Sequence, residues 1–422
     1  MIRKIGLVAV CGLAASVASA QADASRALSS EIAADASART SYQGGSEGFS
    51  IPSASGSSTL NIGGLVSFRT NLNFGDDDAR GEDNDFVWGF ALPHEQIWFY
   101  GNLFNPDFTY MIEAEFQGTE SSDGSFASGG SGSGDFNLRD AWGRYQFENG
   151  VYLQAGQWKT DFTAEQLTED QYILFAERSF IDAYFNAGYT QGVRVGYEGE
   201  TFHIVGNFTD GIQTRNRDWT DPAEADIALG GRFDWLFNGQ WVFDDHTSFR
   251  GSEFSGRVGG AFHWQTMGET GIQTTAGSEA DMFMFTIDAA LEGDGWNASA
   301  AFVGDSIDVD SGDEVTSFGI TVQGGIFITD NDELAARIDA LWRDDDAFTE
   351  DEDQYFLTIG WNHYFFVESH AATAYANLVW GLSETGSIIG SDSHYRGTTA
   401  NGLLGNGEDT EIGLIFGFDA LF

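Results

Sequence analysis

About sixteen segments of the chain alternate apolar and polar side chains with the two-residue period of a β-strand. In residues 110–117, for example, Ile112 and Phe116 share one face, whereas Glu113 and Glu115 occupy the other. This pattern restricts the chain to an all-β fold whose strands separate an apolar face from a polar one. We predict strands at residues 59–72, 87–101, 107–117, 136–147, 150–159, 188–198, 200–209, 226–237, 254–265, 281–292, 295–304, 315–328, 333–343, 353–366, 371–381 and 410–422.

The connections between these segments alternate in length. ENG, EGE and EGDG are tight and contain hairpin residues, whereas FGDDDARGEDND and RDDDAFTEDED are long and acidic. One connection is exceptional, because NGQWVFDDHTSFRGSE follows residue 237, where a short turn is expected. No stretch approaches the roughly twenty apolar residues of a membrane helix. Short turns at one end and long loops at the other predict a transmembrane antiparallel β-barrel of about sixteen strands.

A β-sandwich or a propeller could also show alternation. Aromatic residues near many strand ends, including Trp98 and Trp361, favour the barrel, because they match the girdles at the two membrane interfaces. The last segment ends on Phe422, with Phe416 and Phe418 on the same face. We expect Phe422 to close the barrel against the first strand and to act as a signal for the outer-membrane assembly machinery.

The amino terminus predicts export. Residues 1–20 combine two basic residues, an apolar run and a small-x-small cleavage site, as secretory signal peptides do. Residues 21–58 are predicted to be a flexible periplasmic leader that could contain one short helix, and residues 59–422 the barrel. The one cysteine, Cys11, lies in the signal, so the mature chain offers no disulfide and no cysteine metal site. Secretion without disulfides indicates a Gram-negative-type envelope and, with the barrel, the outer membrane.

The chain is strongly acidic, with 19 Lys and Arg residues against 65 Asp and Glu and a formal net charge of −46. This charge argues against nucleic acid as a partner. We expect the partners to be small ions and hydrophilic solutes, outer-membrane lipid and the assembly machinery.

Three stretches, LRDAWGRYQFENGVYLQAGQWKTDF, EQLTEDQYILFAERSFIDAYF and GYTQGVRVGYEG, resemble the phosphate-selective porin O/P family, and the resemblance extends from about residue 48 to 210. It implies a sixteen-stranded homotrimeric porin whose long third external loop, here about residues 160–187, folds into the lumen. Apolar residues of this loop, including Phe162, Phe175 and Phe180, independently favour packing against an inner wall. The alternative is that the loop caps the barrel mouth or meets a neighbouring subunit.

Strand alternation turns most arginines and several carboxylates toward the lumen, and the loop adds charges of both signs. For a single arginine, an ion pair on the wall is the plainer interpretation. Together, such charges could set the ion preference of a constriction. The predicted pore-lining residues are Glu113, Glu115, Arg144, Lys159, Glu165, Glu169, Asp170, Glu177, Arg178, Asp182, Arg194, Arg232, Arg257 and Arg337.

Phosphate selectivity in the resembled family is associated with an arginine ladder and a lysine-rich constriction. The mature chain keeps a single lysine, Lys159, and its external loops are acidic. These loops should repel anions at low salt, although screening limits their reach to about 8 Å at physiological ionic strength. We therefore predict a water-filled porin for passive diffusion, general or mildly cation-preferring. The alternatives are a phosphate- or anion-selective porin and a non-conducting barrel, either adhesin-like or an enzyme.

Other chemical motifs are weak. DVDSGDE at residues 308–314 resembles the start of a calcium loop, but Gly319 stands where a bidentate Glu is required. The acidic loops could still bind divalent cations loosely. The 7 histidines lack metal-ligand spacing, and no G-x-S-x-G elbow occurs. We predict no catalytic residue, no metal site and no cofactor.

Overall fold

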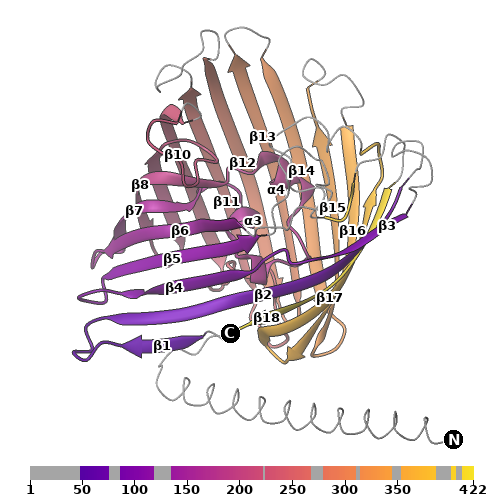
Figure 1. The fold of residues 1–422 in the computed structure, drawn as a ribbon, viewed down its shortest axis with the longest axis horizontal. Coiled ribbons are helices and arrows are strands. Elements are labelled where there is room, and N and C mark those ends of the chain that lie inside the picture. The colour runs from indigo at the N-terminus through magenta and orange to yellow at the C-terminus, as the bar shows by residue number, and fades with distance from the viewer. Residues whose placement is uncertain are drawn as a thin grey trace, which may run out of the picture.

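The computed structural model describes residues 48–75, 86–117, 135–221, 224–267, 279–309, 314–344, 353–385, 401–404 and 411–422. Within these ranges consecutive wall strands pair antiparallel, and the last strand, β18 (Glu411–Leu421), pairs with β2 (Thr59–Phe74), so the sheet closes into a barrel (Figure 1). The remaining wall strands are β3 (Phe86–Ala91), β4 (Gln96–Asn102), β5 (Phe108–Gln117), β6 (Asp135–Gln146), β7 (Val151–Lys159), β8 (Tyr189–Glu198), β9 (Phe202–Thr209), β10 (Ala225–Asn238), β11 (Ser255–Met267), β12 (Ala280–Gly293), β13 (Trp296–Val309), β14 (Val315–Phe327), β15 (Asp332–Trp342), β16 (Asp353–Phe366) and β17 (Ser369–Gly381).

Two of these strands, β3 and β4, form a single wall strand. β3 pairs with residues 69–74 of β2, and β4 pairs with residues 61–65 of the same strand. Residues 92–95 interrupt the pairing, and Pro93 among them cannot donate a ladder hydrogen bond. Counted in this way, the described residues form sixteen wall strands. The predicted barrel is confirmed, although the predicted strand at 87–101 is broken in the middle.

The two faces of the wall differ as the alternation predicts. On β15, Ile338 is 58% exposed, whereas its neighbour Arg337 is 1% exposed. On β5, Ile112 lies on the outside and Glu113 is buried inside the barrel. An apolar outer surface with a polar interior is the arrangement that a barrel in lipid requires.

The barrel closes at its carboxyl terminus. The Phe422 N–H donates to the Gly64 carbonyl at 3.1 Å, and the Gly64 N–H donates to the Phe422 carbonyl at 3.1 Å. Gly64 also makes room for the aromatic ring, because a Cβ at this position would lie 2.3 Å from the Phe422 ring. The expected closure of the last strand against the first is therefore confirmed.

Residues 49–52 differ from the expectation of a flexible leader. They form β1 (Phe49–Pro52), which pairs with residues 59–62 of β2. β1 thus pairs with β2 next to the stretch, residues 65–74, that pairs with β18. The predicted signal peptide and the rest of the leader, up to residue 47, lie outside the described residues.

The connection between β10 and β11, residues 239–254, is the long one at the end of the barrel where the other connections are short. We call it the inserted turn, because its middle part lies inside the barrel. Thr247 and Ser248 are buried, and the Thr247 hydroxyl lies 3.0 Å from the Tyr364 hydroxyl of β16. Phe249 packs edge-on against the same tyrosine, with the ring centroids 5.1 Å apart.

Candidate pore site

Residues 160–188, called the inner loop below, connect β7 to β8 and contain α3 (Ala164–Leu167), η1 (Asp170–Tyr172) and α4 (Phe180–Phe185) (Figure 1). In the described ranges no helix is long and apolar enough to cross a membrane. The loop reaches strands far from its own ends. The Ala176 N–H donates to the Asn377 side chain of β17 at 2.7 Å, and the Arg337 side chain of β15 donates to the Glu177 carbonyl at 3.0 Å.

Hydroxyl residues start both helices of the inner loop. The Thr163 hydroxyl accepts a hydrogen bond from the Gln166 N–H, as N-cap residues do, and donates to the Asp182 carboxylate. The Ser179 hydroxyl accepts from the Asp182 N–H at 2.9 Å and donates to the Glu165 carboxylate at 2.5 Å. These bonds link the beginnings of α3 and α4 and give the loop a defined shape.

Apolar contacts fix α4 to the opposite wall. The Phe180 ring stacks on the Phe356 ring of β16, with centroids 3.8 Å apart, and both side chains are completely buried. Gly319 of β14 allows the close approach of α4, since a Cβ there would lie 2.8 Å from the Phe185 ring. Burying whole phenylalanine side chains contributes roughly 1.5–3 kcal/mol each, so the loop is held by packing as well as by charges.

Asp170 of the inner loop is the centre of a buried ion network. Its carboxylate accepts from Arg139 of β6 at 2.5 Å and from Gln96 of β4 at 2.5 Å, and the Arg178 guanidinium lies 2.5 Å from it in an ion pair. Arg139 also lies 3.2 Å from Glu113 and 3.2 Å from Glu115. Two wall strands and the inner loop are thus joined through one carboxylate.

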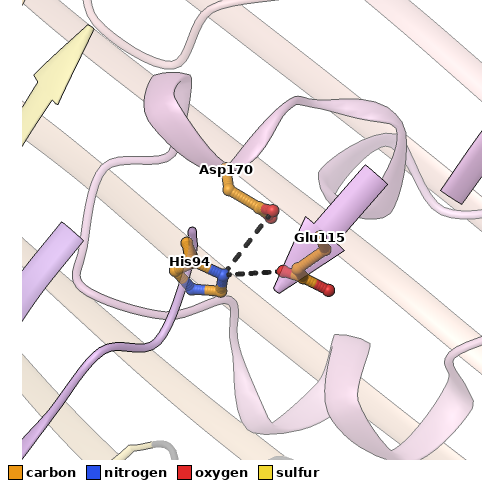
Figure 2. Close-up of side chains that lie close together, drawn as sticks. All are labelled: His94, Glu115 and Asp170. Carbon is orange, nitrogen blue, oxygen red and sulfur yellow. Dashed lines mark ion pairs between the residues drawn. The ribbon is translucent and has the colours of Figure 1, made fainter. Parts of the chain in front are cut away.

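His94 enters the network from the interruption between β3 and β4 (Figure 2). Its Nδ1 lies 3.5 Å from Glu115 and 3.7 Å from Asp170, and its Nε2 lies 3.3 Å from Glu177. His94, Glu115 and Asp170 offer three potential metal-ligand atoms within 4.8 Å of one another. However, the Asp170 oxygen nearest His94 already accepts from the Arg139 guanidinium, so a metal cation there would meet a fixed positive charge. The arrangement fits a protonated histidine better than a bound metal.

The protonation states of His94 and of two carboxyl groups in the inner loop follow from this geometry. Burial alone would lower the pKa of His94, but Glu177 and Asp170 outweigh burial and raise it to about 10. Burial opposes the ionised form of Glu177, yet His94 and Arg69 lower its pKa to about 2. Asp182 differs, because burial and the neighbouring Glu165 raise its pKa to about 7. His94 and Glu177 are therefore both charged at neutral pH.

The structure places the cations predicted from the sequence in ion pairs. Lys159 lies 2.8 Å from Glu169, and Arg194 lies 2.5 Å from Asp161. Nearer the short-turn end, Arg144 lies 2.6 Å from Glu198. The other pairs are Arg232 with Asp234 and Asp288, Arg257 with Asp234 and Asp288, Arg337 with Glu165 and Asp339, Arg178 with Asp170, and Arg69 with Glu177.

The sequence analysis did not identify two residues of the network, Arg139 and His94. Strict alternation turns Arg144 and Asp140 inward and would turn Arg139 outward. The pairing of β5 with β6 shifts register between Ile112 and Ala114, where β6 contains one extra residue, and Arg139 consequently faces the interior as well. His94 was hidden within a predicted continuous strand, although the adjacent Pro93 could have signalled the interruption.

Comparisons with known proteins agree with this architecture. The model of a family described as phosphate-selective porin O and P matches residues 66–282, more than half of the chain. None of the curated protein sequences matches the chain.

Several solved structures are similar in fold. An anion-selective porin from Comamonas acidovorans has 14% identity and a TM-score of 0.57, with 86% of this chain and 100% of that chain covered. OmpT of Vibrio cholerae, in its trimer form, has 15% identity and a TM-score of 0.55 over 87% of this chain and 100% of its own. Salmonella typhi OmpF in complex with daunomycin has 11% identity and a TM-score of 0.57, with 89% and 100% covered.

Proposed function

Because the chain belongs to the phosphate-selective porin O and P family and is an outer-membrane channel for passive diffusion, we propose that its pore weakly prefers cations and has no specific phosphate site. The inner loop and the walls that face it form the constriction in this proposal. The predicted pore-lining residues, from Glu113 to Arg337, then act as one set of fixed charges around the passage.

The pairing of the cations carries this proposal. A tight phosphate site needs several convergent donors that are free to turn toward the anion. Here Lys159 faces Glu169, and Arg139 is shared among Glu113, Glu115 and Asp170. A phosphate entering the pore would have to compete with carboxylates already within hydrogen-bond distance of these groups. The acidic chain, with its net charge of −46, adds a field that attracts cations.

An anion-selective pore is the second candidate. The family description names phosphate, and one of the similar structures is an anion-selective porin. In that case the arginines of β8, β10, β11 and β15 would have to act as a ladder for anions despite their carboxylate partners.

Assembly and chemistry complete the proposal. We expect a homotrimer, since the similar OmpT structure is a trimer form. The same proposal includes no enzymatic activity and no cofactor, and it retains residues 1–20 as a signal peptide that is removed on export.

Phosphate block of the chloride current tests the proposal. The purified channel in a planar bilayer should conduct chloride with little change when phosphate is added at micromolar concentrations. Arg194→Gln should alter the phosphate effect no more than Glu198→Gln. Strong block by micromolar phosphate that disappears in Arg194→Gln would replace the proposal by the anion-selective candidate.

A further inference from the structure

The inserted turn and the inner loop meet inside the barrel. The His246 N–H of the turn donates to the Tyr172 carbonyl of the loop at 2.9 Å, and the His246 Nε2 lies 3.2 Å from the Thr168 hydroxyl. Asp245 lies 2.9 Å from His370 of β17, which fixes the turn to the wall. The passage at this level is therefore bounded by two segments that enter from opposite ends of the barrel.

A space lies between these two segments and the wall formed by β11 to β14. Glu165 of the loop, Asp245 and His246 of the turn, and Arg257 and Glu292 of the wall border it. Burial lowers the pKa of His246, so the imidazole is neutral at neutral pH. Carboxylates thus outnumber cations around the space.

Two polar side chains at this space are buried and have acceptor atoms available. Glu292 is 6% exposed and makes no ion pair or hydrogen bond that the described residues account for. Gln323, also 6% exposed, has an unpartnered Oε1. Both side chains can accept hydrogen bonds, and a buried acceptor such as the Gln323 Oε1 is destabilising until a donor reaches it. Arg257, in contrast, is engaged by Asp234 and Asp288.

Part of the lining is apolar. Ala164 of the inner loop, Phe243 of the inserted turn, and Ala290 and Ala301 of the wall border the same space. An inorganic cation would keep its water and gain little from these side chains, whereas an alkyl group would bury apolar area against them.

We propose that this space is a binding subsite for organic cations, in which a primary ammonium group donates to Glu292 and Gln323 while its alkyl chain packs against Phe243 and the alanines. The subsite rests on the proposed function, since it requires an open, cation-accepting pore, and it specifies the class of solute that such a pore retards. The inserted turn then acts as a second selectivity element, in addition to the inner loop.

Block of the potassium current by n-butylammonium tests the subsite. The wild-type channel should be blocked more strongly by n-butylammonium than by ammonium, because ammonium lacks the alkyl chain, and butyrate should not block. Glu292→Gln should weaken the block by roughly tenfold, the size expected from losing a hydrogen bond to a charged group. Glu253→Gln is the matched control, because it makes the same substitution at an exposed position in the inserted turn. It should leave the block unchanged.

Equal block in Glu292→Gln and Glu253→Gln, or equal block by ammonium and n-butylammonium, would overturn the subsite. Should Glu292→Gln fail to insert, Gln323→Leu provides the second test, since it removes the other acceptor at similar volume and should also weaken the block. Failure of the subsite and failure of the proposed function give different results. A channel that selects potassium without alkylammonium block refutes the subsite alone, whereas a chloride-selective reversal potential refutes the proposed function itself.

Discussion

Arg139 Nη1 lies 2.5 Å from Asp170 Oδ2, and this ion pair joins wall strand β6 to the inner loop. Both side chains are buried, and each has further charged partners. Arg139 also pairs with Glu113 and Glu115, and Asp170 also pairs with Arg178. Ion pairs in such surroundings are weak evidence for net stabilisation, but removing one partner leaves a buried charge uncompensated. The pair is therefore one of the contacts that hold the inner loop against the wall.

Arg139→Gln should destabilise the channel strongly. The variant leaves Glu113, Glu115 and Asp170 without their shared cation, and breaking a buried pair in this way costs roughly 3–5 kcal/mol. The free energy of unfolding in lipid vesicles measures the loss, and increased current noise would report a loosened loop. Arg144→Gln is the control, because its partner Glu198 is largely exposed and such pairs contribute about 0–1 kcal/mol. Equal losses in the two variants would contradict the role assigned to Arg139.

The inner loop should loosen at both extremes of pH. The pKa of His94 is raised from 6.5 to about 10, so its contribution to stability is complete below about 6.5 and is lost as the pH rises through 10. The pKa of Glu177 is lowered from 4.5 to about 2, so its contribution is complete above 4.5 and is lost as the pH falls toward 2. Single-channel noise should be lowest between these limits.

His94→Gln separates the two transitions. Without the imidazole, the rise in noise near pH 10 should disappear, while the acidic transition remains. An alkaline transition that persists unchanged in His94→Gln would show that another group causes it.

The outer and inner faces of β5 should respond differently to substitution. Ile112 is 47% exposed on the outer face, and an arginine there should cost roughly 2–4 kcal/mol if the position lies near the bilayer midplane. Glu113→Gln should insert and instead change conductance. Glu113→Arg should not be tolerated, because Arg139 lies 3.2 Å from Glu113, and two guanidinium groups would be forced together. Yield of heat-modifiable barrel measures insertion of both variants, and single-channel conductance measures the effect of Glu113→Gln. Normal insertion of Ile112→Arg would contradict the outward assignment.

Loss of Phe422 should impair assembly. Deleting it removes two backbone hydrogen bonds to Gly64 and leaves the closing edge of the barrel incomplete in lipid. Phe422→Lys keeps the backbone but places a charge beside the apolar surface, and Phe422→Tyr, which keeps the ring, is the control. The abundance of folded barrel in the outer membrane should fall for the deletion and for lysine but not for tyrosine. Normal abundance of all three would refute the role of this residue.

The wall of the barrel was predictable because it depends on local alternation, which fixes Ile338 outside and Arg337 inside without knowledge of any partner. The ion network was only partly predictable. The inward direction of the Arg139 side chain depends on an extra residue in β6. Such a bulge can be recognised only once the register of β6 with β5 is known. The entry of the inserted turn into the barrel was also beyond the sequence, since it depends on contacts such as Thr247 with Tyr364, more than a hundred residues apart. Its unusual length was the one available signal.

The reversal potential of the wild-type channel in a potassium chloride gradient decides between a pore that prefers cations and one that prefers anions. At about 0.01 M ionic strength, where the Debye length is about 30 Å, the potential should have the sign of potassium selectivity. It should move toward zero near 1 M, where the Debye length is about 3 Å and the acidic side chains are screened. A reversal potential with the sign of chloride selectivity at low salt would contradict the account, because the paired arginines would then be acting as an anion ladder.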